Sequence, residues 1–126
     1  MPNIEKNTSG FKRLPRATLC SLKGYKAAWI YESGFRQYTV VSLTLFPVAY
    51  LLAKSFEHFF LLIGTLVFLL FAEIVNSALE ALADAVMPEY NELVGRAKDL
   101  GSAAVFTALL FALLVWLHGL YTYFIA

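Results

Sequence analysis

Three long apolar blocks limit what this chain can fold into. They run from about Tyr38 to Ala53, from Phe59 to Ala72 and from about Ser102 to Ala126, and none contains Asp, Glu, Lys or Arg. A helix needs about 20 mainly apolar residues to cross about 30 Å of hydrocarbon. Hydrophobic residues make up 60% of the 126 positions, and the mean hydropathy of +0.65 is too high for a soluble domain of this size. We expect one all-α membrane domain over residues 1–126.

The blocks and their flanks predict four helices. These are a surface helix over about residues 8–30 and membrane helices over about 32–53, 56–86 and 100–124. Thr8 or Ser9 is the expected N-cap of the surface helix, whose basic and apolar side chains suit the headgroup region of a membrane. The alternative is that this helix only anchors the chain in one orientation.

The distribution of positive charge predicts the orientation. Seven of the ten lysines and arginines precede the first block, and the next connection contains only Lys54. The connection over residues 87–101 contains Arg96 and Lys98. Because cytoplasmic loops carry the excess of Lys and Arg, we expect the N-terminus and the 87–101 loop in the cytoplasm.

Four polar side chains continue the second membrane helix beyond its apolar part. Glu73, Asn76, Glu80 and Asp84 stand at i, i+3, i+7 and i+11, which places them on one helix face about 16 Å long. We call this set the polar stripe. An ionised carboxylate at membrane depth costs several kcal/mol unless it finds a partner. A helix that leaves the membrane after Ala72 would explain Asp84, but it explains Glu73 poorly because the span would then be only about 17 residues long.

The residue types of the polar stripe favour phosphoryl transfer. Carboxylates are hard oxygen ligands that suit Mg²⁺, which completes its coordination with substrate phosphates, and Glu32 is a third candidate ligand. Asp99, Gly101 and Ser102 are expected to open the third membrane helix, where free backbone N–H groups and Lys98 can bind phosphate oxygens. Arg13 and Arg16 are further phosphate-binding candidates. A base such as Glu73 can accept the proton of a lipid hydroxyl.

Other chemistries find less support. Cys20, His58 and His118 are isolated, so no zinc cluster is expected. The chain also lacks the Gly-x-x-x-x-Gly-Lys-Ser/Thr loop of soluble nucleotide-binding folds. An ion pathway along the polar stripe remains an alternative, although the stripe ends near mid-membrane and the third span offers no acidic partner.

Three segments resemble the small prokaryotic diacylglycerol kinases: KGYKAAWIYESGFRQ, EIVNSALEALAD and EYNELVGRAKDLGSAAV. The resemblance extends from about Gly10 into the third span. It implies a multi-pass protein of the bacterial inner membrane with a surface helix and three spans. It also implies a homotrimer whose active sites lie between subunits, transferring the γ-phosphoryl group of MgATP to diacylglycerol to give phosphatidic acid. Undecaprenol kinase, which uses the same scaffold, is the alternative.

The resemblance also implies roles for individual residues. Glu73 would be the catalytic base, and Glu32 and Glu80 the Mg²⁺ ligands. Residues that would contact ATP are Arg13, Cys20, Glu32, Asn76, Glu80, Glu89, Tyr90, Asn91, Lys98 and Asp99. Residues that would contact the lipid substrate are Arg13, Lys26, Trp29, Gly34, Phe35, Glu73 and Ser102. Cys20 stands where the family has an aromatic residue, and Tyr31 replaces a smaller polar one. Neither departure removes the chemistry, but each is a position that can alter nucleotide affinity or preference.

Overall fold

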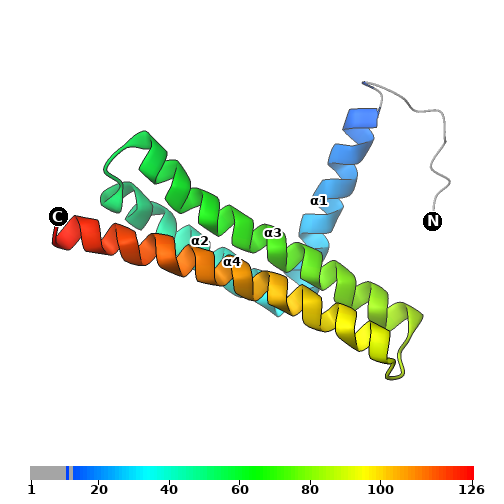
Figure 1. The fold of residues 1–126 in the computed structure, drawn as a ribbon. Coiled ribbons are helices and arrows are strands. Elements are labelled where there is room, and N and C mark those ends of the chain that lie inside the picture. The colour runs from blue at the N-terminus through cyan, green and yellow to red at the C-terminus, as the bar shows by residue number, and fades with distance from the viewer. Residues whose placement is uncertain (1–10, 12) are drawn as a thin grey trace.

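The computed structural model describes Phe11 and residues 13–126, which form four helices: α1 Arg13–Tyr31, α2 Ser33–Leu52, α3 Phe56–Val86 and α4 Glu92–Phe124. Helices α2, α3 and α4 lie side by side in an elongated bundle, and α1 projects from it (Figure 1). No strand occurs in this part of the chain. The all-α prediction is therefore confirmed, whereas the expected cap at Thr8 or Ser9 lies outside the described residues.

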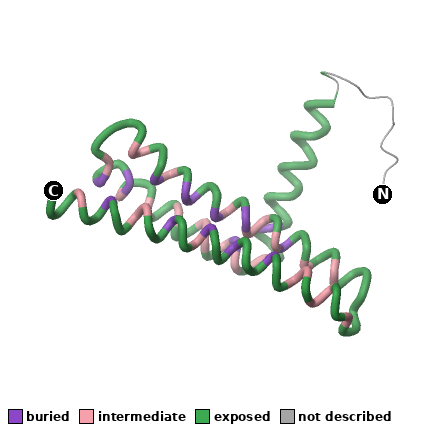
Figure 2. Tube along the Cα trace, viewed as in Figure 1, coloured by how far each residue is buried: buried purple, intermediate pink, exposed green. Residues whose placement is uncertain are grey.

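Helix α1 is almost entirely exposed. Only Ala28 is buried on it (Figure 2). Pro15 is tolerated because it is the third residue of the helix, where a backbone N–H has no partner within the helix. The principal contacts of α1 are with α2.

Helices α3 and α4, with 31 and 33 residues, are long and apolar enough to cross a membrane. Helix α2 has 20 residues and contains Pro47, and it is less apolar than the other two. Residues 53–55 separate α2 from α3, and the Ser55 hydroxyl accepts a hydrogen bond from the His58 N–H at 3.1 Å, which caps α3.

The expected start of the last helix at about residue 100 is wrong. Helix α4 begins at Glu92, because the Asn91 side chain accepts hydrogen bonds from the N–H groups of Leu93 and Val94 at 2.9 and 3.3 Å. The connection therefore contains residues 87–91 rather than 87–101. Asn91 directly before a helical sequence is an N-cap signal that was available in the sequence.

Two buried clusters hold the bundle together. One contains Leu69, Ala72, Val105 and Ala108, and the other contains Ala49, Leu52 and Leu62. The buried residues of α4 are small or medium-sized (Gly101, Val105, Ala108, Ala112 and Gly119), which permits a close approach to α3.

A buried hydrogen bond sets the register between α3 and α4. The Trp116 indole N–H donates to the Thr65 hydroxyl at 3.0 Å, and that hydroxyl donates to the Leu62 carbonyl at 2.7 Å. Because Thr65 is fully buried, sliding either helix would leave a polar group without a partner. This register places Gly101 of α4 against the polar stripe.

Candidate active site

The polar stripe faces two other parts of the molecule. Glu73, Asn76 and Glu80 are half-buried on α3, whereas Asp84 is exposed near its end. Gly34, just after the junction between α1 and α2, lies against Glu73. Gly101 of α4 lies against Asn76. The stripe is therefore a contact surface rather than an ordinary solvated face.

Glu73 lies where several acidic groups converge. The carboxylates of Glu80 and Glu32 both act on it electrostatically, and the Ser77 hydroxyl lies beside it. A Cβ atom at Gly34 would come within 2.5 Å of Glu73 Oε1, so the backbone of α2 approaches this carboxylate closely. In the described part of the chain, the only ion pairs are Glu92–Arg96 and Asp84–Lys98, so none of Glu73, Glu80 and Glu32 forms an ion pair, although the Lys98 charge also acts on Glu80.

Asn76 connects the middle of the stripe to α4. Its Nδ2 donates a hydrogen bond to Glu80 Oε1 at 3.2 Å. Its Oδ1 is buried against Gly101 and has no hydrogen-bond partner among the described residues. Leaving a buried acceptor without a partner costs free energy.

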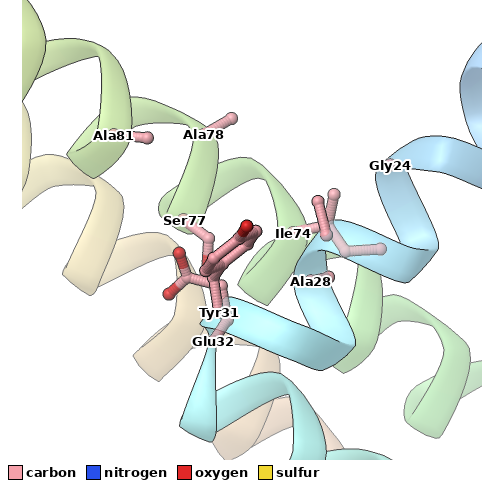
Figure 3. Close-up of a pocket in the computed structure, with 9 residues that line it drawn as sticks. Gly24, Ala28, Tyr31, Glu32, Ile74, Ser77, Ala78 and Ala81 are labelled. Carbon is pink, nitrogen blue, oxygen red and sulfur yellow. The ribbon is translucent and has the colours of Figure 1, made fainter.

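A groove of about 370 Å³ lies between α1 and α3 (Figure 3). Its walls are mainly small or apolar residues: Gly24, Ala27 and Ala28 of α1 with Ile74, Ala78 and Ala81 of α3. Glu32 and Ser77 supply its polar groups, and Tyr31 lies beside them. The groove can hold an apolar chain whose polar end lies near the acidic groups.

The first turns of α4 form a second, more polar region. A groove of about 470 Å³ is lined by Tyr90, Glu92, Gly95, Arg96, Lys98 and Asp99. A neighbouring groove of about 240 Å³ includes Glu89, Asn91 and Lys98. The Lys98 Nζ donates to Asp84 Oδ1 at 2.6 Å. This region therefore brings together five of the residues expected at the nucleotide: Glu89, Tyr90, Asn91, Lys98 and Asp99.

The earlier start of α4 changes one expectation about phosphate binding. Asp99, Gly101 and Ser102 lie inside the helix, so they do not open it and their N–H groups do not form a helix start. Any phosphate contact from this segment must come from side chains, among which Lys98 carries the positive charge.

Several expected site residues are not brought together within one chain. Arg13 and Cys20 are exposed in the N-terminal half of α1, the helix that projects from the bundle (Figure 1). Lys26, Trp29 and Ser102 are also exposed. Phe35 is buried at the start of α2, one residue after Gly34.

Sequence reasoning missed Ser77 beside Glu73, although its position one turn after Glu73 on α3 was a usable signal.

The residues present fit a magnesium ion that is shared with a phosphate ligand. No group of three or more His, Cys, Asp or Glu side chains within Phe11 and residues 13–126 can hold a metal by itself. Mg²⁺, however, is commonly held by one or two carboxylates together with water and substrate phosphates. Glu32 and Glu80 are such carboxylates, and both act electrostatically on Glu73.

Comparison of the sequence with known proteins assigns the chain to a family. The family model for prokaryotic diacylglycerol kinase matches residues 19–120. The chain belongs to the prokaryotic diacylglycerol kinase family. Diacylglycerol kinase of Escherichia coli is 43% identical over 118 residues, covering 94% of this chain and 97% of that protein. The Pseudomonas aeruginosa enzyme is 41% identical over 115 residues, covering 91% and 94%, and the Haemophilus influenzae enzyme is 37% identical over 109 residues, covering 86% and 92%.

The diacylglycerol kinase match covers every part of the site described above. Residues 19–120 include the junction between α1 and α2, the whole polar stripe and the first turns of α4. Arg13 lies before the matched region.

Proposed function

We propose that this chain transfers the γ-phosphoryl group of ATP to the free hydroxyl of diacylglycerol, giving phosphatidic acid. The observation that carries the proposal is the position of the acidic group. Glu80 and Glu32 both act electrostatically on Glu73, and none of the three forms an ion pair within the described residues. They lie next to an apolar groove that Glu32 and Ser77 also line. This arrangement suits a lipid hydroxyl beside a base and a magnesium-bound phosphate.

Glu73 is proposed as the general base. It lies beside Gly34, where the close approach of the α2 backbone limits the positions of the carboxylate. It would accept the proton of the attacking hydroxyl, and the lipid would be positioned by Lys26, Trp29, Gly34, Phe35 and Ser102. Proton transfer by a positioned side chain contributes about 10²- to 10⁴-fold to a rate.

Glu32 and Glu80 are proposed as the Mg²⁺ ligands, because both carboxylates act electrostatically on Glu73. When bound, Mg²⁺ would balance the charge of the ATP phosphates. Asn76 keeps the Glu80 carboxylate in place through its hydrogen bond. Lys98, Asp99 and the turn formed by Glu89, Tyr90 and Asn91 would hold the nucleotide.

A homotrimer with shared active sites is part of the proposal. Arg13 and Cys20, which are expected at the nucleotide, lie in the N-terminal half of α1, and this helix projects from its own bundle. They would reach the nucleotide of a neighbouring subunit. Many large apolar side chains on α2, α3 and α4 are exposed in the single chain, which suits contact with lipid and with other subunits.

The proposed setting is the bacterial inner membrane, with α2 as a third span beside α3 and α4. The N-terminus and the connection between α3 and α4 would then lie in the cytoplasm, where ATP is present. Positive charge before the first span supports this orientation.

The test is phosphate transfer from ATP labelled at the γ-position in mixed micelles that contain Mg²⁺. Diacylglycerol and undecaprenol are offered side by side to purified protein. Labelled phosphatidic acid is expected. Labelled undecaprenyl phosphate instead would keep the scaffold and the mechanism but change the substrate. No transfer to either lipid by folded protein would contradict the proposed reaction.

The metal assignment gives a separate prediction. Glu80→Gln and Glu32→Gln are each expected to raise the Mg²⁺ concentration for half-maximal activity by about tenfold, because each substitution removes one of two charged ligands. The measurement is activity as a function of free Mg²⁺ at saturating ATP and lipid. Glu57→Gln, an exposed glutamate in the first turn of α3, is the matched control. An unchanged Mg²⁺ dependence in either variant would remove that residue from the ligand set.

A further inference from the structure

The junction between α1 and α2 is very short. Helix α1 ends at Tyr31 and α2 begins at Ser33, so Glu32 alone connects them. Glu32 has an extended backbone, with φ −114° and ψ 103°. Its N–H donates to the Ala28 carbonyl at 3.0 Å and its carbonyl accepts from the Arg36 N–H at 3.2 Å. The proposed metal ligand is therefore the residue at which the chain changes direction.

Arg36 closes this junction from the α2 side. Its Nη1 donates to the Trp29 carbonyl at 2.7 Å and to the Ile30 carbonyl at 3.0 Å. Carbonyl groups in the last turn of a helix have no partner within that helix, so they need a donor from outside it. A guanidinium at a helix C-terminus also interacts favourably with the helix dipole. One side chain of α2 thus holds the end of α1.

Few other contacts fix the direction of α1. Ala28 is its only buried residue, and its principal contacts are with α2. The groove beside it is lined mainly by small or apolar side chains and contains no hydrogen bond between α1 and α3 among the described residues. The two hydrogen bonds of Arg36 are therefore the main polar constraint on where α1 points.

We propose that Arg36 is a positioning residue, which sets the direction of α1 and the position of Glu32 relative to Glu73 by holding the Trp29 and Ile30 carbonyls. It acts through the junction and does not take part in the chemical step. On one side of the junction it fixes Glu32 and Gly34, and on the other it fixes the α1 wall of the groove. This role rests on the proposed function of the same site, but the position of α1 can be measured without turnover.

The test combines kinetics with a direct report on α1. Arg36→Met keeps a long apolar side chain but removes every donor, and Arg36→Lys keeps the charge and three ammonium donors but lacks the length and the planar fork of the guanidinium. Thr44→Val is the matched control, because Thr44 is exposed on α2 and donates only to the Val40 carbonyl one turn back. Cys20 is the one cysteine of the chain and is exposed on α1, so a nitroxide can be attached there without further substitutions.

For each protein, the spectrum and the oxygen accessibility of the Cys20 nitroxide are measured in bilayers, and kcat, KM and Mg²⁺ dependence are measured on unlabelled protein. Arg36→Met is expected to change the accessibility of the label and to lower kcat/KM by about tenfold or more, with a raised Mg²⁺ requirement. Arg36→Lys is expected to recover a large part of the wild-type label accessibility and of the wild-type kcat/KM. Thr44→Val is expected to match the wild type in label accessibility and in kcat/KM.

Two results would overturn the proposal. One is a loss of activity in Arg36→Met while the Cys20 label keeps its wild-type environment, which would mean that Arg36 contacts substrate directly. The other is wild-type behaviour of Arg36→Met in both measurements. If Arg36→Met does not fold, the same comparison is made with Arg36→Lys, for which a partial shift of the label is required. A wild-type protein that is inactive on both lipids would contradict the proposed function, whereas the label would still show whether Arg36 holds α1.

Discussion

Glu73→Gln is expected to abolish phosphoryl transfer, with a fall in kcat of about 10³-fold or more. The amide keeps the size and the hydrogen-bonding capacity of the side chain but cannot accept the proton of the lipid hydroxyl. Because the acidic groups Glu80 and Glu32 act on Glu73, removal of its negative charge also lessens their mutual repulsion. We therefore expect thermal stability in detergent to be unchanged or slightly raised.

The measurement is the initial rate of phosphatidic acid formation at saturating MgATP, together with the thermal unfolding midpoint and the binding of ATP. Glu57→Gln is again the matched control, since it makes the same substitution at an exposed position in the first turn of α3. Retained turnover in Glu73→Gln would exclude this residue as the base. A loss of folding in that variant would instead indicate a structural role for the carboxylate.

Gly101→Val is expected to cause the second large effect, a loss of both activity and stability. A Cβ atom at Gly101 would collide with Asn76 Oδ1 and come within 3.3 Å of Leu79 Cδ1, both on α3. Overpacking of this kind costs about 1–3 kcal/mol. Because the Asn76 side chain would have to move, its hydrogen bond to Glu80 would be lost as well. Activity should therefore fall more than the unfolding free energy alone would explain.

Thermal unfolding and kcat/KM measured on the same preparations check this prediction. Gly64→Val provides the matched control, because no atom lies within 4 Å of a Cβ built at Gly64 on α3. Gly101→Ala is expected to show an intermediate effect. If Gly101→Val behaves like Gly64→Val, the close contact between α4 and the polar stripe is not important for function.

Much of the helical architecture could be predicted because its signals are local. The range 56–86 expected for the second membrane helix agrees with α3, since a continuous apolar stretch passes directly into a polar stripe of helical period. The start of α4 was missed by about two turns, because charged residues from Glu92 to Asp99 were taken for a loop. The Asn91 cap and the helical propensity of the segment decide otherwise.

Partners of the polar stripe were only partly predictable. The spacing of Glu73, Asn76, Glu80 and Asp84 on one helix follows from the sequence alone. That Asp84 pairs with Lys98 across the connection, or that Asn76 meets Gly101, does not follow from it. Such contacts depend on how far α4 is rotated and shifted along α3.

By itself, the sequence determined that this is a helical membrane protein with a face of carboxylates on α3, because composition and periodicity act along a single element. Only the tertiary structure decided which groups meet that face. The Trp116–Thr65 hydrogen bond joins residues 51 positions apart and sets the α3–α4 register. Arg36 joins the ends of α1 and α2 and so brings Glu32 beside Glu73. Both contacts give hydrogen-bond partners to polar groups that would otherwise have none. The relative positions of the helices follow from these hydrogen bonds.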